Sequence, residues 1–552
     1  MESQTKQCQN CKKNFVIELD DFAFYEKMKV PPPTWCPECR QQRRILIRNF
    51  RTLYKRNSDK SGKPTISMCS KKVPFPVWSH DEWWSDDWDA HDYGRDVDFS
   101  KPFFLQIKSL WDVVPRSAII VTQSVSCDYS NAVLTGKNLY LVFGTVDCED
   151  CMYGHIVWNS KDCVDDLYVF KSELCCECVD VLGSYHVLYS QECEDCNNCI
   201  GLFDCRGCSN CIGCVGLRQK SNYLFNESVG KEKIEEFLRR YPIHDPKTIS
   251  MILEKRKELR NKVPQRFFFG SHNADVSGNH IYHAKNVHYS FDVKSGEDSK
   301  YIFTCRQAID SYDISFTADI ELGYQNLHCF GRNIMFSNTC INCTYTYYSE
   351  NCTNCHNIFG CEGLKSDEYC ILNKKYSKEE YEVLLPKLIK HMEQAGEWGN
   401  FFPKEIMPFA YNESIVNEYF PLTKEQALAQ GYRWEDDIPR TKGQETISND
   451  KLPKDPGFFT NELTGEVLRC DTCSYNYRLT SQEISFYKRL NLALPLDCYN
   501  CRHERRMKSR NARTLFQGYC SKCNKEIQTS YNPEQQKQYK IYCEQCYQQE
   551  VA

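Results

Sequence analysis

Cysteines arranged in C-x2-C pairs constrain this chain more than any other feature. The 552 residues include 35 cysteines, and such pairs stand near both ends. The opening stretch, MESQTKQCQNC, lacks the apolar segment of a secretory signal, and no apolar run is long enough to span a membrane. Many cysteines without a signal indicate metal ligands or buried thiols rather than disulfides. The sequence therefore predicts a cytoplasmic metal-binding protein without membrane contact.

The two ends of the chain are copies of each other. Residues 8–61 align without a gap to residues 470–523, and 17 of the 54 pairs are identical. The aligned cysteines are Cys8, Cys11, Cys36 and Cys39 with Cys470, Cys473, Cys498 and Cys501. Two C-x2-C knuckles supply a complete tetrahedral thiolate shell for zinc, with no position left for a reacting water. Each set therefore predicts a structural zinc site.

A further pair of knuckles closes the chain at Cys520, Cys523, Cys543 and Cys546. With a two-residue shift, the corresponding N-terminal positions hold Ser58, Ser61, Ser79 and Glu82. Serine hydroxyls are poor zinc ligands. We therefore expect three structural zinc sites, and a half-ribbon without metal in the place of a fourth.

The stretch CQNCKKNFVIELDDFAFYEKMKVPPPTWCPECRQQRR resembles the probable zinc-ribbon family of small bacterial proteins. The family pattern is two C-x2-C knuckles, a central Phe-Tyr (here Phe24-Tyr25) and an arginine after the last cysteine (here Arg40). The resemblance covers the ribbon of each copy, and the C-terminal copy matches less well. It implies a zinc ribbon and no settled activity. The whole chain also resembles uncharacterised Cys-rich proteins of small-genome bacteria, which implies nothing further about chemistry.

Each copy continues into an arginine-rich helix. At about 100° per residue, the arginines of one copy fall within roughly 140° of the helix surface. They are Arg40, Arg43, Arg44, Arg48 and Arg51, with Arg502, Arg505, Arg506, Arg510 and Arg513 in the second copy. The net charge of -5 argues against a uniformly basic protein, so any nucleic-acid contact must be local. Because guanidinium groups bind phosphate oxygens in pairs, these rows predict binding to a nucleic-acid backbone, with structured RNA or the ribosome favoured.

Two other interpretations of the arginines remain open. The segment HDEWWSDDWDAHDYGRDVD, residues 80–98, carries eight Asp or Glu against one Arg, with three interleaved tryptophans. It offers an internal or protein–protein docking partner through salt bridges and cation–π contacts. A solvated charged face is the third interpretation.

A second duplication lies in the middle of the chain, where residues 213–238 match residues 360–385. Upstream of each copy, short hydrophobic alternation such as NLYLVFGTV indicates strands. Cysteine pairs such as Cys127 with Cys148 and Cys340 with Cys361 recur 21 residues apart. Short strands with a period near 20 predict a parallel β-solenoid, a right-handed β-helix, in two halves. A pair of β-sandwiches is the alternative.

The predicted fold is multidomain and mainly β, with bracing α-helices between and after the solenoid halves and zinc ribbons at both ends. The expected domains are a ribbon with a basic helix (1–57), a metal-free half-ribbon with the acidic Trp segment (58–116), solenoid half one (117–228), helices (229–265), solenoid half two with a terminal helix (266–395), an extended connector (396–466) and tandem ribbons (467–552).

The middle cysteines leave three interpretations open. Runs of C-x2-C occur at Cys193, Cys196, Cys199, Cys205, Cys208, Cys211 and Cys214. They resemble the run of bacterial ferredoxins but lack the proline that follows it. A ladder of buried thiols, additional zinc and an iron–sulfur cluster are the alternatives, and the ladder is favoured.

No motif of a nucleotide-binding, hydrolase or metalloprotease site is present. A carboxylate cluster on a solenoid face, Asp310, Asp313, Asp319 and Glu321, is the remaining enzymatic candidate for a carbohydrate-active β-helix. Surface solvation explains these residues more simply. We therefore expect a non-enzymatic scaffold with zinc as its cofactor and no small-molecule substrate. Its partner is nucleic acid or, alternatively, a protein complex.

Overall fold

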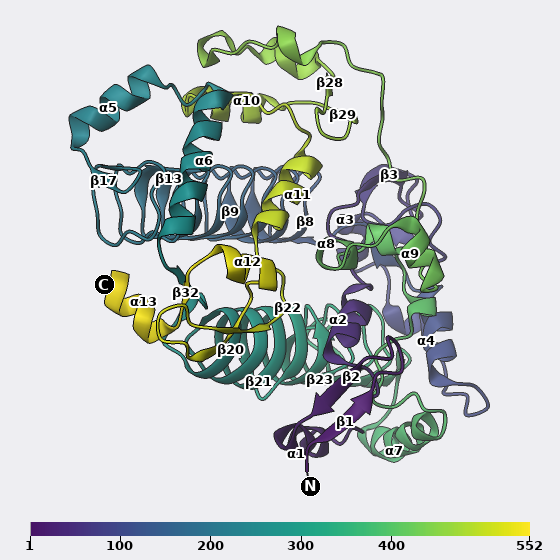
Figure 1. Cartoon of the computed structure of the whole chain (residues 1–552). Helices are drawn as coiled ribbons and strands as arrows, with labels where there is room; N and C mark the ends of the chain where they lie inside the picture. The colour runs from purple at the N-terminus through teal and green to yellow at the C-terminus, as the bar shows by residue number, and fades with distance from the viewer. Residues whose placement is uncertain (1, 552) are drawn as a thin grey trace. The chain divides into compact units, whose positions relative to one another are not determined.

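The computed structural model describes residues 2–551 (Figure 1). The chain forms two compact units, each assembled from separated segments. Unit 1 contains the residues up to Ala118, then Phe268–Asp437 and Arg513–Leu515. Unit 2 contains Ile119–Phe267, Ile438–Ala512 and the residues from Phe516 onward. Each unit therefore combines one end of the chain with a segment from its middle.

Unit 1 begins with two related small modules. The first consists of β1 (Gln4–Gln7), β2 (Asn14–Ile17), α1 (Leu19–Lys27) and α2 (Pro37–Ile45). Pro37 opens α2, where its fixed φ suits the first helical turn and its missing N–H costs nothing. The second module consists of β3 (Tyr54–Asn57), β4 (Pro64–Ser67), β5 (Val77–Trp78), α3 (His80–Trp84), η1 (Ala90–Tyr93), α4 (Phe103–Trp111) and β6 (Arg116–Ser117).

Unit 2 is built on a long parallel ladder, here called ladder A (residues 119–228). Neighbouring strands pair twelve residues apart, as in Leu167↔Val179 and Val181↔Cys193. Single bridges continue this step to Ile212↔Leu224. The strands are β7 (Val121–Thr122), β8 (Asn131–Lys137), β9 (Phe143–Glu149), β10 (His155–Trp158), β11 (Leu167–Phe170), β12 (Val179–Leu182), β13 (Tyr185–Leu188), β14 (Gln191–Glu194), β15 (Asn197–Ile200) and β16 (Tyr223–Leu224). The ladder ends where β17 (Glu227–Ser228) pairs antiparallel with β16.

Unit 1 contains a second parallel ladder, here called ladder B (residues 268–376). Its usual step is also twelve residues, as in Ile302↔Ile314, but it shortens to eleven at Ile320↔Gly331. Its strands are β19 (Gly270–Ser271), β20 (Ala274–Tyr282), β21 (Ala284–Ile309), β22 (Tyr312–Leu327), β23 (Phe330–Met335), β24 (Ile341–Tyr347), β25 (His356–Phe359) and β26 (Glu368–Ile371). The ladder ends where β27 (Lys374–Lys375) pairs antiparallel with β26.

The predicted period near 20 residues, drawn from cysteine pairs 21 residues apart, is wrong, because the pairing step is twelve. The backbone conformation of ladder A repeats every three residues, and we call each group of three a triplet. Every third residue from Tyr153 to Lys171 has a positive φ, a region that asparagine and aspartate tolerate better than most residues. Cysteines fill the inward place of many triplets, so their spacings are multiples of three. A spacing of 21 residues equals one twelve-residue repeat plus three triplets. Two cysteines at this spacing therefore do not lie directly above one another in the ladder.

The interior of ladder A is rich in cysteine. Cys205, Cys208, Cys211 and Cys214 occupy the inward places of successive triplets and are all buried. Their thiols donate to backbone carbonyls nine residues further on, as from Cys208 Sγ to the oxygen of Leu217 at 3.6 Å. The C-x2-C runs in this region therefore follow from the triplet backbone.

Helices lie beside both ladders. α5 (Lys231–Arg240) and α6 (Pro246–Lys262) follow ladder A, and α7 (Lys378–Gln394) follows ladder B, close to the predicted positions (Figure 1). Ile252 of α6 is fully buried, and Arg256 donates to the carbonyl of Tyr189 in ladder A at 2.8 Å. In unit 1, the ring of Tyr381 in α7 packs against Tyr369 of β26.

The tandem module of unit 2 completes the fold. Its elements are β28 (Leu468–Arg469), β29 (Asn476–Tyr477), α10 (Ser481–Arg489), α11 (Tyr499–Ser509), β30 (Phe516–Tyr519), β31 (Glu526–Thr529), α12 (Pro533–Gln538), β32 (Ile541–Tyr542) and α13 (Glu544–Val551). β32 pairs in parallel with β18 (Gln265–Arg266). This pairing ties the last ribbon to the segment that follows α6.

The predicted extended connector is partly helical. Between ladder B and the tandem module lie η2 (Lys404–Ile406), η3 (Tyr411–Glu413), α8 (Val416–Tyr419), α9 (Lys424–Ala429), η4 (Asn449–Lys451), η5 (Pro456–Phe458) and η6 (Asn461–Gly465). Phe401 and Phe402 are fully buried, so the start of this segment packs into unit 1. Across residues 2–551, no helix has the length and apolar character needed to cross a membrane.

Candidate metal centres and arginine docks

Three groups of four cysteines bring their sulfur atoms within 4.8 Å of one another. They are Cys8, Cys11, Cys36 and Cys39; Cys470, Cys473, Cys498 and Cys501; and Cys520, Cys523, Cys543 and Cys546. In each group the first knuckle follows a strand, and the second opens a helix, namely α2, α11 or α13. The sequence predicted all twelve of these residues together.

The geometry of the clusters fits a tetrahedral metal ion. The Sγ atoms of Cys11 and Cys36, of Cys473 and Cys498, and of Cys523 and Cys543 each lie 3.7 Å apart. Four sulfurs at about 2.3 Å from a central ion would be separated by about 3.8 Å. The backbone N–H of Cys36 donates to Cys8 Sγ at 3.2 Å, a contact that stabilises a thiolate. The hydrogen bond from Cys39 lowers the pKa of the Cys36 thiol to about 5.

The half-ribbon keeps the ribbon backbone without its cysteines. The N–H of Cys8 donates to the carbonyl of Lys13, and the N–H of Ser58 donates to the carbonyl of Lys63 in the same way. Ser58 Oγ donates to Glu82, which also accepts from the N–H of Ser79 at 2.9 Å. Burial would raise the pKa of Glu82, but hydrogen bonds from Ser58, Ser61 and Ser79 lower it to about 2. Side-chain hydrogen bonds thus join the second half of this module to the first.

The helix α11 runs beside ladder A (Figure 1). Its residues Arg502, Arg505 and Arg506, with Arg510 directly after its last residue, form what we call the C-terminal dock with Asp165, Glu177 and Asp180. Asp165 is fully buried between Arg502 at 2.9 Å and Arg506 at 3.0 Å. Arg510 makes two parallel contacts to Asp180, at 2.8 and 2.9 Å. The helix is therefore joined to the ladder by buried ion pairs.

Arg40, Arg43 and Arg44 of α2, with Arg48 after the helix, form the equivalent N-terminal dock on ladder B around Asp313. The prediction that all five arginines of each copy share one helix is wrong, because α2 ends at Ile45 and α11 at Ser509. Arg40 Nε lies 2.8 Å from Asp313 Oδ2, and Arg44 Nη1 lies 3.4 Å from Oδ1. Asp165 and Asp313 both have a positive φ, near 60°. The central aspartate of each dock therefore occupies the positive-φ position of a ladder triplet.

Six of the ten predicted phosphate-binding arginines are buried in these docks: Arg40, Arg43, Arg44, Arg48, Arg502 and Arg506. Arg510 is largely buried against Asp180, and Arg513 pairs with Asp292 at 2.7 Å within unit 1. Arg51 is partly exposed, and the Arg505 side chain remains 55 % exposed although it contacts Glu177. The arginine face of each helix thus contacts a ladder of its own unit, and an external phosphate would have to displace most of these contacts.

Within the chain, the acidic Trp segment does not dock on an arginine helix, so the internal form of that alternative is wrong. It lies on the last repeats of ladder B, where the Lys365 ammonium stands over the rings of Trp83, Trp84 and Trp88. His91 contacts Asp367, and Asp96 accepts from Lys374 at 2.6 Å. Ladder lysines, rather than arginines, attract this segment.

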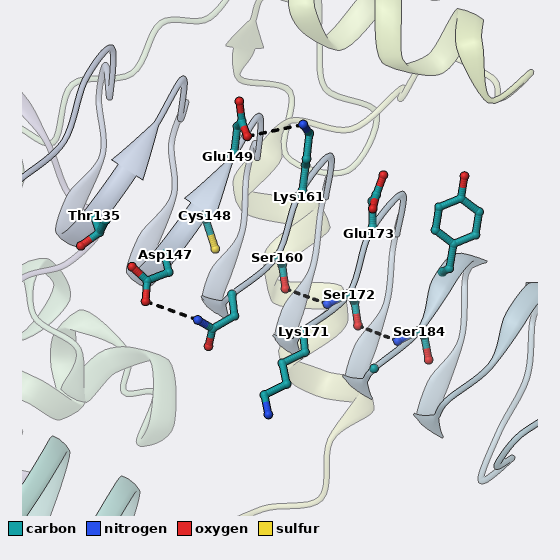
Figure 2. A pocket seen from close by; sticks show the side chains of 13 residues that line it. Thr135, Asp147, Cys148, Glu149, Ser160, Lys161, Lys171, Ser172, Glu173 and Ser184 are labelled. Atoms are coloured by element: carbon teal, nitrogen blue, oxygen red, sulfur yellow. Dashed lines mark hydrogen bonds and ion pairs between the residues drawn. The ribbon is translucent and has the colours of Figure 1, made fainter.

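A shallow groove of about 720 Å³ runs along ladder A (Figure 2). A serine column forms part of it, with the N–H of Ser172 donating to Ser160 Oγ and the N–H of Ser184 donating to Ser172 Oγ. Glu149 contacts both Lys137 and Lys161, and the hydrogen bond from Lys137 lowers its pKa. Glu149 is therefore held as a carboxylate rather than as a proton donor.

The four carboxylates weighed as an enzymatic cluster have separate partners. Asp313 is buried in the N-terminal dock, whereas Asp310 pairs with Lys27 at 3.0 Å. Asp319 pairs with Arg306, and Glu321 lies 3.4 Å from Arg332. Each carboxylate is thus engaged by a different cation.

Sequence reasoning missed Asp165 and gave Asp313 the wrong role. A usable signal was present, because the two aspartates lie 148 residues apart, close to the 147-residue offset of the middle duplication. The eleven-residue step in ladder B accounts for the difference of one.

No protein-family model matches the chain, and no curated protein matches it in sequence. The likeness to zinc ribbons therefore rests on the cysteine clusters and their geometry.

Proposed function

We propose that this chain is a non-enzymatic zinc-binding scaffold that acts through contacts with other proteins. The observation that carries the proposal is that both arginine helices are engaged by aspartates of their own units. Arginines held this way serve to fasten a ribbon to a ladder. The outward surfaces of the ladders are then the parts left to meet a partner.

Zinc is the ion we propose for the three cysteine clusters. All-thiolate tetrahedral shells with no open position are typical of structural zinc. Metal binding stabilises small modules that lack a sufficient core of their own. In this protein each metal would also fix the start of a helix, two of which carry the docking arginines.

We infer further that both ladders are β-solenoids. Parallel pairing at a usual step of twelve residues, with steps of eleven in ladder B, and positive φ values that recur every third residue through much of both ladders support this inference. Stacked repeats of this kind give long, regular surfaces, which repeat proteins use for binding. The right-handed sense stays a prediction.

The test is hydrogen exchange of the full-length protein before and after chelation. We expect metal removal to raise exchange in α2 and α11 and, at the same time, in the ladder strands that they cover. A ladder whose exchange does not change when its ribbon loses metal would refute the fastening role. Affinity purification with the double variant Arg502→Gln/Arg506→Gln should then show fewer partner proteins than the wild type.

Binding to a nucleic-acid backbone, with structured RNA favoured, remains the second candidate. The exposed Arg505 side chain supports it, since this residue extends beyond the buried row. Filter binding at increasing salt tests it, because phosphate contacts weaken as salt rises. Salt-dependent RNA affinity that falls in Arg505→Gln would favour this candidate over the protein-binding scaffold.

A further inference from the structure

The two docks differ in charge. In the C-terminal dock each of the four arginines pairs with a carboxylate, from Asp165, Glu177, Asp180 or Glu483. In the N-terminal dock Arg40 and Arg44 share Asp313. Arg43 and Arg48 form no ion pair with any described residue. The N-terminal dock therefore buries more positive charge than it neutralises.

The difference has a clear origin in the two ladders. Glu177 stands twelve residues after Asp165, and the residue twelve after Asp313 is Gln325. Asp180 stands fifteen residues after Asp165, and its counterpart after Asp313 is His328. Two carboxylates of ladder A are thus replaced by neutral side chains in ladder B.

A third carboxylate of the C-terminal dock has a counterpart that pairs with a different cation. Glu483 of α10 accepts from Arg502 at 3.2 Å. Its counterpart in the first copy is Asp21, at the ribbon offset of 462, and Asp21 pairs instead with Lys300 at 2.8 Å. Nothing in the ribbon itself therefore restores the missing charge.

Arg48 shows where the missing charge would lie. Its counterpart Arg510 presents its Nε and Nη2 atoms to Asp180, at 2.8 and 2.9 Å. Arg48 is only 2 % exposed and donates from Nη1 to Thr339. Its Nε and Nη2 atoms are buried and have no hydrogen-bond partner in residues 2–551. The Nε and Nη2 donors of this arginine thus bind a carboxylate in the C-terminal dock but have no hydrogen-bond partner among the described residues in the N-terminal dock.

Arg48 remains charged near neutral pH. Burial lowers its pKa to about 10, which still leaves the guanidinium protonated. Burial and the nearby Arg48 lower the pKa of His328 well below its usual value, so the imidazole is neutral and adds no charge. Glu350, whose charge opposes the effect of burial on the pKa of Arg48, is paired with Arg116 at 3.0 Å. A buried, unpaired charge of this kind is costly.

We propose that the Nε–Nη2 edge of Arg48 binds a small oxyanion, which replaces the carboxylate that Asp180 supplies in the other dock. Two parallel N–H donors match two oxygens of a phosphate or a carboxylate. Arg43, which donates to the Gln325 amide oxygen at 3.4 Å and lies over the Trp35 ring, adds positive charge to the same dock. The anion completes the attachment of the N-terminal ribbon to ladder B.

The first test is equilibrium dialysis of the full-length protein with radiolabelled inorganic phosphate, alongside a parallel measurement with acetate. Ionic strength is held constant with chloride. We expect saturable binding of one anion per chain and a rise in the unfolding temperature with anion concentration. If only phosphate binds and raises the unfolding temperature, the site is specific for a phosphoryl group. If only acetate does so, the site is specific for a carboxylate. The absence of saturable binding of either anion would overturn the proposal.

The second test exchanges the residues at the equivalent positions 180 and 328, Asp in the C-terminal dock and His in the N-terminal dock. His328→Asp supplies a carboxylate to Arg48, so it should weaken anion binding at least tenfold and raise stability without added anion. Asp180→His removes the carboxylate from Arg510, so it should create anion-dependent stability in the C-terminal dock. Anion binding that is unchanged in His328→Asp places the anion elsewhere and overturns the assignment. If that variant fails to fold, Arg48→Lys, which keeps the charge but loses the two-donor edge, should show the same loss of affinity.

Discussion

The Nε atom of Arg40 lies 2.8 Å from Oδ2 of Asp313, although the two residues are 273 positions apart in the sequence. Both side chains are almost completely shielded from solvent. Asp313 also accepts from Arg44, so one carboxylate holds two guanidinium groups of the same helix. The first ribbon is therefore attached to the second ladder, and the second ribbon is attached to the first ladder by the same chemistry at Asp165.

Replacing the docking aspartate should destabilise unit 1 strongly. Asp313→Asn leaves Arg40 and Arg44 buried without their counter-charge, and breaking a buried pair typically costs about 3–5 kcal/mol. Urea unfolding of the full-length protein measures the effect. Asp319→Asn is the matched control, because its pair with Arg306 is exposed and should contribute less than about 1 kcal/mol. Equal losses in the two variants would contradict the assignment of Asp313 to the dock.

Metal content should follow the three cysteine clusters. We expect three zinc ions per chain by elemental analysis, and no iron. Cys473→Ser removes one ligand from the second cluster and should lower the count to two. Cys208→Ser is the control, because this buried thiol is part of the interior of ladder A, and the count should stay at three. Iron in the purified protein, or a fall in zinc with Cys208→Ser, would assign metal to the ladder cysteines.

The half-ribbon should accept a metal when its cysteines are restored. Ser58, Ser61, Ser79 and Glu82 retain the backbone hydrogen bonds of a knuckle and interact with one another. The quadruple variant with cysteine at these four positions should therefore bind one zinc ion more than the wild type. Elemental analysis and cobalt absorption detect it. A variant that folds and binds no additional metal would show that the two halves are not spaced for a tetrahedral site.

The metal clusters could be predicted from sequence because their signal is local, whereas the docks could not. The spacing of Cys8, Cys11, Cys36 and Cys39 specifies a four-thiolate metal site with little help from the rest of the fold. The role of an arginine depends on which ladder residues its side chain contacts in the folded protein. Arg43 and Arg505 occupy the same place in two equivalent helices, yet one reaches Gln325 and the other Glu177. That difference lies in the ladders, far away in the sequence.

The ladder period was misread for a related reason. Cysteine marks the inward place of a triplet, not the start of a repeat, so distances such as that from Cys127 to Cys148 measure triplets. The twelve-residue step does place identical residues opposite one another, as at Val157↔Val169 and Val169↔Val181, and Cys151, Cys163 and Cys175 recur at the same spacing. This signal was present in the sequence, but the 21-residue cysteine spacings obscured it. Parallel strands and bracing helices could still be predicted, because they depend on hydrophobic alternation and amphipathic charge rather than on the exact period.

The buried carboxyl of Glu362 should make the stability of unit 1 depend on pH. Burial raises its pKa to about 8, even though Arg116 lies 3.5 Å away and Asn351 donates to it at 2.8 Å. Its usual pKa is 4.5, so the folded state holds a proton that the unfolded state has lost between these two values. The free energy of unfolding should therefore fall as pH rises from about 4.5 to about 8, and it should fall less in Glu362→Gln, whose amide cannot ionise. Urea unfolding of unit 1 at several pH values measures this difference, with Glu368→Gln, an exposed glutamate on the same ladder, as the control. If Glu362→Gln and the wild type lose stability in parallel over this range, the pH dependence arises from another group.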